Sequence, residues 1–189
     1  MFIKSVLNVV SLLVIAGGAR VAFAGSEQKS PYVDAEGYCV VDIDSSNPYR
    51  YVQQRVIDVP DIKGHVIRIY KADQKMKNTK LCNGDSLVLN NWYAMTDYID
   101  NDGSSSGYII FNTEKGDQLF LKITGNSQKK VGEDLSDIQA VGRIIGGYGD
   151  LSAAEGDYQY VGKFNRDKEI IQPIMNKLRY KIVDKDAKK

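Results

Sequence analysis

The feature that most limits the fold of this chain is an alternation of apolar and polar residues with a period of two. It is clear in "YIIFNT" at 108–113 and in "QLFLKIT" at 118–124, which flank the turn "EKGD". Such alternation is typical of half-buried β-strands, whereas an amphipathic helix repeats every ~3.6 residues. Turn signals separate about eight runs of this kind, which predicts an all-β fold, an antiparallel β-barrel of about eight strands.

Predicted strands and their connections account for residues 37–185, which we interpret as a single β-barrel domain. Charged or polar stretches at 71–85, 100–107 and 125–137 are interpreted as connections. At most one short helix is expected near the C-terminus, at 167–177, where apolar residues recur at helical spacing around Pro173. The strands are expected at 38–43, 49–59, 65–70, 86–98, 108–113, 118–124, 138–147, 156–164 and 178–184.

The first 24 residues have the organisation of a secretory signal. A basic start is followed by an apolar core and by the small-x-small sequence Ala22-Phe23-Ala24. The alternative is a membrane anchor, but the core is shorter than the ~20 apolar residues that a span needs. We therefore expect a signal peptide at 1–24, a flexible leader at 25–36, a basic tail at 186–189, and export to the periplasm or the medium.

Charge and hydropathy exclude two classes of partner. Cleavage after Ala24 would remove Lys4 and Arg20 and leave 23 basic and 24 acidic residues. That balance lacks the basic footprint of a nucleic-acid-binding protein. No other apolar run is long enough to span a membrane once the signal is cleaved. The sequence does not show whether the protein is a monomer or an oligomer.

Cys39 and Cys82 are the only cysteines in the chain. In an oxidising compartment a pair of cysteines is expected to form a disulfide. The alternative, a catalytic or metal-binding pair, lacks both a CxxC spacing and a nearby histidine.

A glycine-rich segment, "GRIIGGYGDLSAAEGDYQYVGKF" at 142–164, interrupts the strand pattern. Glycines in such a position mark bulges, tight bends or close approach of another backbone, so Gly146, Gly147, Gly149 and Gly156 are predicted to be structural. At least one of Gly147 and Gly149 should adopt a positive φ. A phosphate-binding loop is disfavoured, because no lysine and no helix follow the glycines.

Together with "GYIIFNTEKGDQLFLKITGN" at 107–126, this segment resembles the allene oxide cyclase barrel-like superfamily. That group includes the dirigent proteins and bacterial secreted proteins of unknown role. The resemblance covers roughly 86–164 and rests on Gly146–Leu151 followed by Ala154, Gly156 and Gly162. It implies a β-barrel whose glycines turn the chain between strands. It implies no activity, because no cyclase or dirigent catalytic residue matches a position of this chain.

Several familiar catalytic and metal sites are disfavoured by the sequence. His65 is the single histidine, so a histidine-ligated metal site has too few ligands. The segment "GSSSG" at 103–107 matches the nucleophile-elbow pattern but lies between two β runs, without the helix that the elbow requires. The acidic loop containing Asp97, Asp100 and Asp102 fails the spacing of a calcium loop. We predict no metal and no cofactor.

Aromatic side chains provide the remaining candidate site. Tyr158 and Tyr160 share one strand face, and Trp92 and Tyr108 join them if their strands are neighbours. With Arg143 as a polar anchor, these residues predict a barrel mouth for a small apolar or aromatic ligand. The alternative is an ordinary core with tyrosine hydroxyls at its rim.

Three functions remain open from the sequence. The first is a non-enzymatic exported protein that binds a small hydrophobic ligand or a protein partner. The second is a cyclase-type enzyme, which needs a buried polar group aimed at the reacting atom. The third is a protein that acts through interactions alone, with a filled barrel.

Overall fold

The computed structural model describes residues 29–129, 132, 135–165 and 168–184. The predicted signal peptide at 1–24 and the predicted basic tail at 186–189 lie outside the described residues. No helix in the described ranges combines the length and apolarity needed to cross a bilayer.

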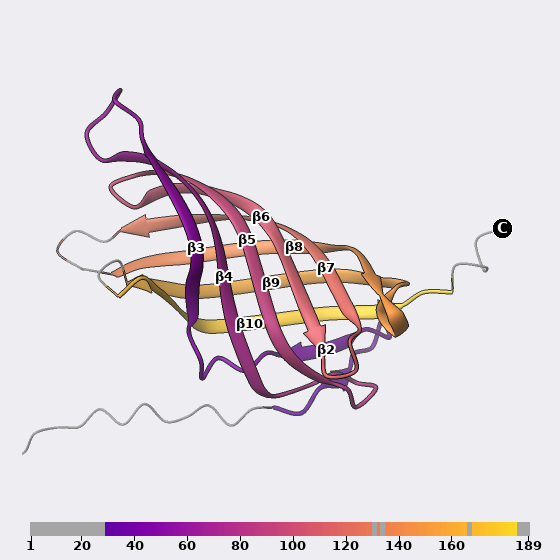
Figure 1. Cartoon of the computed structure of the whole chain (residues 1–189). Helices are drawn as coiled ribbons and strands as arrows, with labels where there is room; N and C mark the ends of the chain where they lie inside the picture. The colour runs from indigo at the N-terminus through magenta and orange to yellow at the C-terminus, as the bar shows by residue number, and fades with distance from the viewer. Residues whose placement is uncertain (1–28, 130–131, 133–134, 166–167, 185–189) are drawn as a thin grey trace, which may run out of the picture.

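The described chain forms one antiparallel sheet of ten strands, in the order β1-β2-β10-β3-β4-β5-β6-β7-β8-β9 (Figure 1). Since β9 also pairs with β10, the strands β3 to β10 close into a ring of eight. The prediction of an all-β, antiparallel, barrel-like fold is therefore confirmed. The strands are β1 (Tyr32–Val33), β2 (Cys39–Asp42), β3 (Tyr49–Asp58), β4 (His65–Lys80), β5 (Ser86–Ile99), β6 (Asp102–Thr113), β7 (Gln118–Lys129), β8 (Leu135–Tyr148), β9 (Ala154–Asn165) and β10 (Ile170–Ile182), and a short 3₁₀ turn, η1 (Gly149–Leu151), follows β8.

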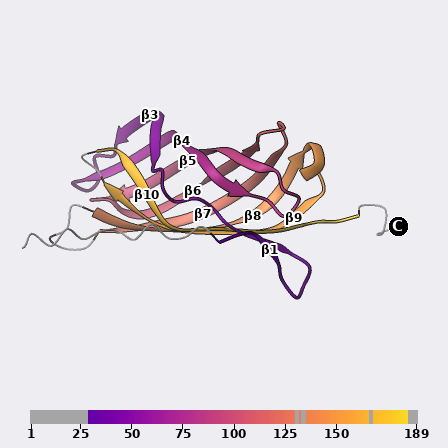
Figure 2. The ribbon, with the colours of Figure 1, turned by 90° about the horizontal axis from the view of Figure 1, so that it is seen from below.

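The ring closes through a short seam between β3 and β10. Two residue pairs form it, Ile170 with Arg50 and Ile171 with Tyr49. Further along β10, the same edge pairs with β2 at 177–180. Figure 2 shows that β1 and its adjoining turn lie outside the ring, so part of the predicted leader pairs with β2.

Three segments that we interpreted as connections are strands in the structure. β4 continues through Lys80, β6 begins at Asp102, and β7 extends to Lys129. These strands lack a clear alternation of apolar and polar residues in the sequence, because some of their inward-facing side chains are polar. Ser105 and Ser127, for example, are buried within the ring. Neighbouring strands supply backbone hydrogen bonds regardless of side-chain polarity, so the ladders continue.

The expected helix at 167–177 is wrong, because β10 occupies this segment. The register of β10 against β9 shifts between Pro173 and Met175, as at a β-bulge. A bulge moves the inward-facing set by one residue, so a strand acquires apolar spacings that resemble those of a helix. Proline is tolerated at such a point because the ladder is already interrupted there.

A disulfide joins Cys39 on β2 to Cys82 in the turn after β4, with Cα atoms 5.9 Å apart. This confirms the predicted pairing. The bond spans 43 residues and ties the strand beside the seam to the β4–β5 turn. In the chain-entropy model, a loop of that size contributes about 4 kcal/mol to stability.

The glycine-rich segment forms the bend between β8 and β9. Gly149 begins η1 with a φ of 65°, a conformation in which an L-residue is strained. A Cβ on Gly147 would lie 2.2 Å from the backbone oxygen of Leu151, so this position has no room for a side chain. Gly146 lies opposite Phe120 on β7, and Gly156 opposite Tyr180 on β10.

Candidate functional site

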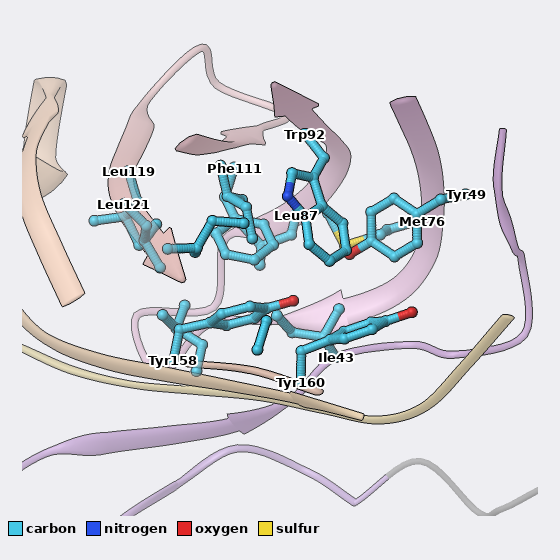
Figure 3. Close-up of a cluster of buried hydrophobic side chains, with 14 of the residues drawn as sticks. Ile43, Tyr49, Met76, Leu87, Trp92, Phe111, Leu119, Leu121, Tyr158 and Tyr160 are labelled. Carbon is cyan, nitrogen blue, oxygen red and sulfur yellow. The ribbon is translucent and has the colours of Figure 1, made fainter. Parts of the chain in front are cut away.

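Three of the predicted site residues lie in the centre of the ring. Trp92 on β5 and Tyr160 on β9 are edge to face with ring centroids 5.1 Å apart, and Tyr49 on β3 contacts both rings at 5.2 and 5.9 Å. Tyr158 lies beside them, packed against Phe111 (Figure 3). Each of these side chains is at most 1% exposed, so aromatic rings fill this part of the interior.

A group of polar atoms surrounds the hydroxyl of Tyr49. The amide nitrogens of Asn90 and Asn176 donate to this oxygen at 2.5 and 3.4 Å. Burial raises the pKa of Tyr49, and the neighbouring hydroxyl of Tyr158 and the Asn176 amide oppose that shift more weakly. Burial also raises the pKa values of Tyr158 and Tyr160. These phenols are therefore neutral at physiological pH and supply hydrogen bonds rather than a phenolate base.

The interior also contains polar atoms that have no hydrogen-bond partner among the described residues. They include the side-chain oxygens of Asn90 and Asn176, the indole nitrogen of Trp92 and the hydroxyl of Tyr160. A buried polar group left unpaired costs about 1–3 kcal/mol, so the contribution of each of these atoms to stability is open to test by substitution.

The other two predicted site residues, Tyr108 and Arg143, lie on the outer surface of the ring. Tyr108 is 50% exposed and lies opposite Tyr93 of β5, which is 40% exposed. The structure therefore divides the predicted constellation: Trp92, Tyr158 and Tyr160 meet inside, while Tyr108 and Arg143 face away from them. Tyr93, which was not among the predicted site residues, is the aromatic neighbour of Tyr108.

Around these two tyrosines the surface forms a groove of about 490 Å³ across β3 to β6. We call it the outer groove. The side chains that define it are Arg55, Ile69, Lys71, Tyr93, Met95 and Tyr108. Ile69 and Met95 are 57% and 48% exposed, so the groove presents apolar surface to solvent.

Strand register explains why these residues share a face. One outward row passes across neighbouring strands from Lys71 to Tyr93 and Tyr108. The next row passes from Arg55 to Ile69 and Met95. Side chains directly opposite each other on adjacent strands have Cβ atoms ~5 Å apart, so each row forms a continuous strip. The sequence pattern that could have identified the groove is the spacing of two residues between positions 69 and 71 on β4 and between positions 93 and 95 on β5, which puts each pair on one face.

Basic side chains flank the two tyrosines on the outer face: Lys71 on one side, and Arg143 on the other. The Nζ atom of Lys71 lies 3.5 Å from a carboxylate oxygen of Asp73 and 5.8 Å from the ring centroid of Tyr93. In the described part of the chain, no carboxylate lies within ion-pair distance of Arg55 or Arg143. Arg143 lines a second, smaller hollow of about 350 Å³ with Lys122 and Val141.

His65 is held between two carboxylates on the surface. Its Nδ1 lies 2.6 Å from Asp61 and its Nε2 lies 2.7 Å from Asp97. The hydrogen bond with Asp61, followed by that with Asp97, raises the pKa of His65. Because both ring nitrogens are engaged, the arrangement is a clasp between the β3–β4 turn and β5 rather than a base beside a serine. Ser105 of the "GSSSG" segment is buried in β6, in a strand and not in a nucleophile elbow.

One acidic cluster in the described residues has the composition of a cation site. Carboxylate oxygens of Asp85, Asp117 and Asp150 lie within 4.8 Å of one another. However, the ammonium of Lys115 lies 2.5 Å from Asp85, and Asp117 accepts the backbone N–H of Asp150 at 3.3 Å. Lys115 thus already supplies a positive charge. The three aspartates are far apart in sequence, so no local motif identifies the cluster.

Comparisons with protein-family models, with curated proteins and with solved structures found no match to this chain. The resemblance to the allene oxide cyclase barrel-like superfamily therefore stays a prediction from the glycine and hairpin motifs.

Proposed function

We propose that this protein is an exported, non-catalytic binding protein that takes a small apolar or aromatic ligand in the outer groove. The observation that carries the proposal is the groove itself, about 490 Å³ in volume and lined by Ile69, Tyr93, Met95 and Tyr108. Its volume falls within the ~300–1,000 Å³ typical of small-molecule sites, which are mostly apolar with a few polar groups. Exposed aromatic and thioether side chains supply a large contact area.

The centre of the ring is a weaker candidate for the ligand. Trp92, Tyr49 and Tyr160 already contact one another there. The cyclase-type alternative is favoured by one observation, the unpaired polar atoms beside these rings. Against it, the buried phenols are neutral, and a substrate would have to displace packed aromatic side chains.

A protein partner is the second candidate, because exposed apolar side chains continue beyond the outer groove. Ile57, two residues from Arg55 on the same face of β3, extends the apolar surface there, and Val141 and Ile145 are further exposed apolar residues on β8. Large exposed apolar patches are characteristic of interaction sites. Export would place this surface outside the cytoplasm, where the disulfide between Cys39 and Cys82 is stable.

The proposal is tested by titrating the mature protein with naphthalene-based probes, neutral and charged, using calorimetry and NMR. We expect saturable binding with shift changes at the amides of Tyr93, Met95 and Tyr108. Tyr108→Thr should weaken binding about tenfold, since it removes a ring contact worth ~1.5 kcal/mol. Val141→Thr is the matched control, because Val141 is 61% exposed but lies outside the groove.

Trp92 distinguishes the two possible places of binding. It is buried in the core, so occupation of the outer groove should leave its emission maximum unchanged. A probe that enters the ring would shift that emission and would bind equally well to Tyr108→Thr. That result, or the lack of any saturable binding, contradicts the proposed function.

A further inference from the structure

We propose that the ligand of the outer groove is a small anion, with an aromatic or aliphatic body and a single carboxylate or sulfonate held by Arg55. This inference rests on the proposed function, and it names the chemical class of the ligand and the residue that selects it.

The groove has its cations on one side and its aromatic side chains on the other, with the apolar Ile69 of β4 beside Arg55. Arg55 and Lys71 stand on β3 and β4, whereas Tyr93 and Met95 stand on β5 and Tyr108 on β6. Strands lie ~4.8 Å apart, so the two sides are separated by about the length of a small aromatic molecule. A ligand lying across the strands would place its apolar body over the tyrosines and its head group beside the cations.

Of the two cations, Arg55 is the one available to a ligand. The ammonium of Lys71 lies 3.5 Å from Asp73 and is drawn over the ring of Tyr93. No carboxylate among the described residues pairs with Arg55, and its side chain is exposed. The planar guanidinium also presents paired N–H donors that match a carboxylate or sulfonate.

The immediate surroundings of the groove do not oppose an anion. None of the residues that line it is acidic. Beside the groove, Asp73 is paired with the ammonium of Lys71 at 3.5 Å, and Glu169 accepts a hydrogen bond from Gln54 at 2.8 Å. A ligand carboxylate beside Arg55 therefore meets a cation within a groove whose own lining carries no negative charge.

The experiment compares two probes of the same shape, 2-naphthoate and neutral 2-naphthamide, on the full mature protein. We expect 2-naphthoate to bind about fivefold more tightly at low salt, the gain of an exposed but charge-assisted contact. The preference should shrink at 0.5 M NaCl, because at about that ionic strength the Debye length is only a few ångströms. Arg55→Gln should abolish the preference while leaving the affinity for 2-naphthamide unchanged.

Arg143→Gln is the matched control, since it removes the same charge from an exposed arginine that lines the neighbouring hollow. We expect it to keep the preference for 2-naphthoate. Equal loss in Arg55→Gln and Arg143→Gln would overturn the assignment to Arg55. Equal affinities for the two probes would overturn the anionic class and leave the proposed function standing, whereas no binding of either probe would overturn both.

Discussion

Trp92 and Tyr160 pack edge to face across the ring, with centroids 5.1 Å apart, although their strands, β5 and β9, are not neighbours. Hydrogen bonding between neighbouring strands does not by itself bring these two side chains together. They meet only when the sheet has closed into a ring. This contact shows that the centre of the ring is packed by side chains from opposite walls.

Tyr160→Phe should leave the free energy of unfolding within about 0.5 kcal/mol of the parent or raise it. The hydroxyl of Tyr160 is buried without a hydrogen-bond partner among the described residues, so its removal relieves an unpaired group. Urea unfolding followed by Trp92 fluorescence measures the change. Tyr160→Ala is the reference for lost packing, with an expected loss of about 3–5 kcal/mol.

Phenylalanine at Tyr49 should, in contrast, lower the free energy of unfolding. Its hydroxyl accepts from Asn90 at 2.5 Å and from Asn176 at 3.4 Å, so Tyr49→Phe leaves two buried amides without that acceptor. We expect a loss of about 1–3 kcal/mol in the same unfolding experiment. Equal stabilities of the two phenylalanine variants would contradict the hydrogen-bonding scheme of the core.

Alanine at Gly147 or Gly149 should destabilise the protein by about 1–3 kcal/mol. A Cβ at Gly149 would lie 1.7 Å from Oδ1 of Asp117, and the residue has a φ of 65°. Gly116→Ala is the control, because its φ is also positive at 94° but its Cβ would meet open space. Thermal unfolding should rank Gly116→Ala as the mildest of the three variants.

The His65 clasp should make stability depend on pH. Because hydrogen bonds with Asp61 and Asp97 raise the pKa of His65, its contribution is complete below the unfolded pKa of ~6.5 and is lost as pH rises through the folded pKa. The pKa of Asp61 is lowered, mainly by its hydrogen bond with His65, so its contribution is lost only as pH falls below ~4. The melting-temperature difference between the parent and His65→Gln should therefore be larger at pH 5.5 than at pH 9. An equal difference at both pH values would contradict the clasp.

Reduction of the disulfide should lower the free energy of unfolding by about 2–4 kcal/mol. The bond ties β2 to the β4–β5 turn, so hydrogen exchange should quicken first at 39–42 and 81–85. Cys39→Ser/Cys82→Ser provides the same comparison without a reductant. Exchange that quickens uniformly over the whole ring would contradict a local role for the bond.

The period-two pattern determined the all-β class, the antiparallel pairing and the relative facing of residues within a strand. It placed Tyr158 and Tyr160 on one face because side chains two residues apart in a strand point the same way. Cysteine content and the expected compartment identified the disulfide, since only one pairing was available.

Only the tertiary structure decided which face of each strand points inward and which strands meet across the ring. Trp92 and Tyr93 are adjacent aromatic residues, yet one is buried in the core and the other is exposed in the outer groove. Bulges, such as the register shift between Pro173 and Met175, reset the inward phase partway along a strand. Alternation along one strand shows which residues share a face, but it does not show which of the two faces points into the ring. Whether a side chain lies inside or outside depends on the neighbouring strands that close the ring, and those contacts link residues far apart in the chain.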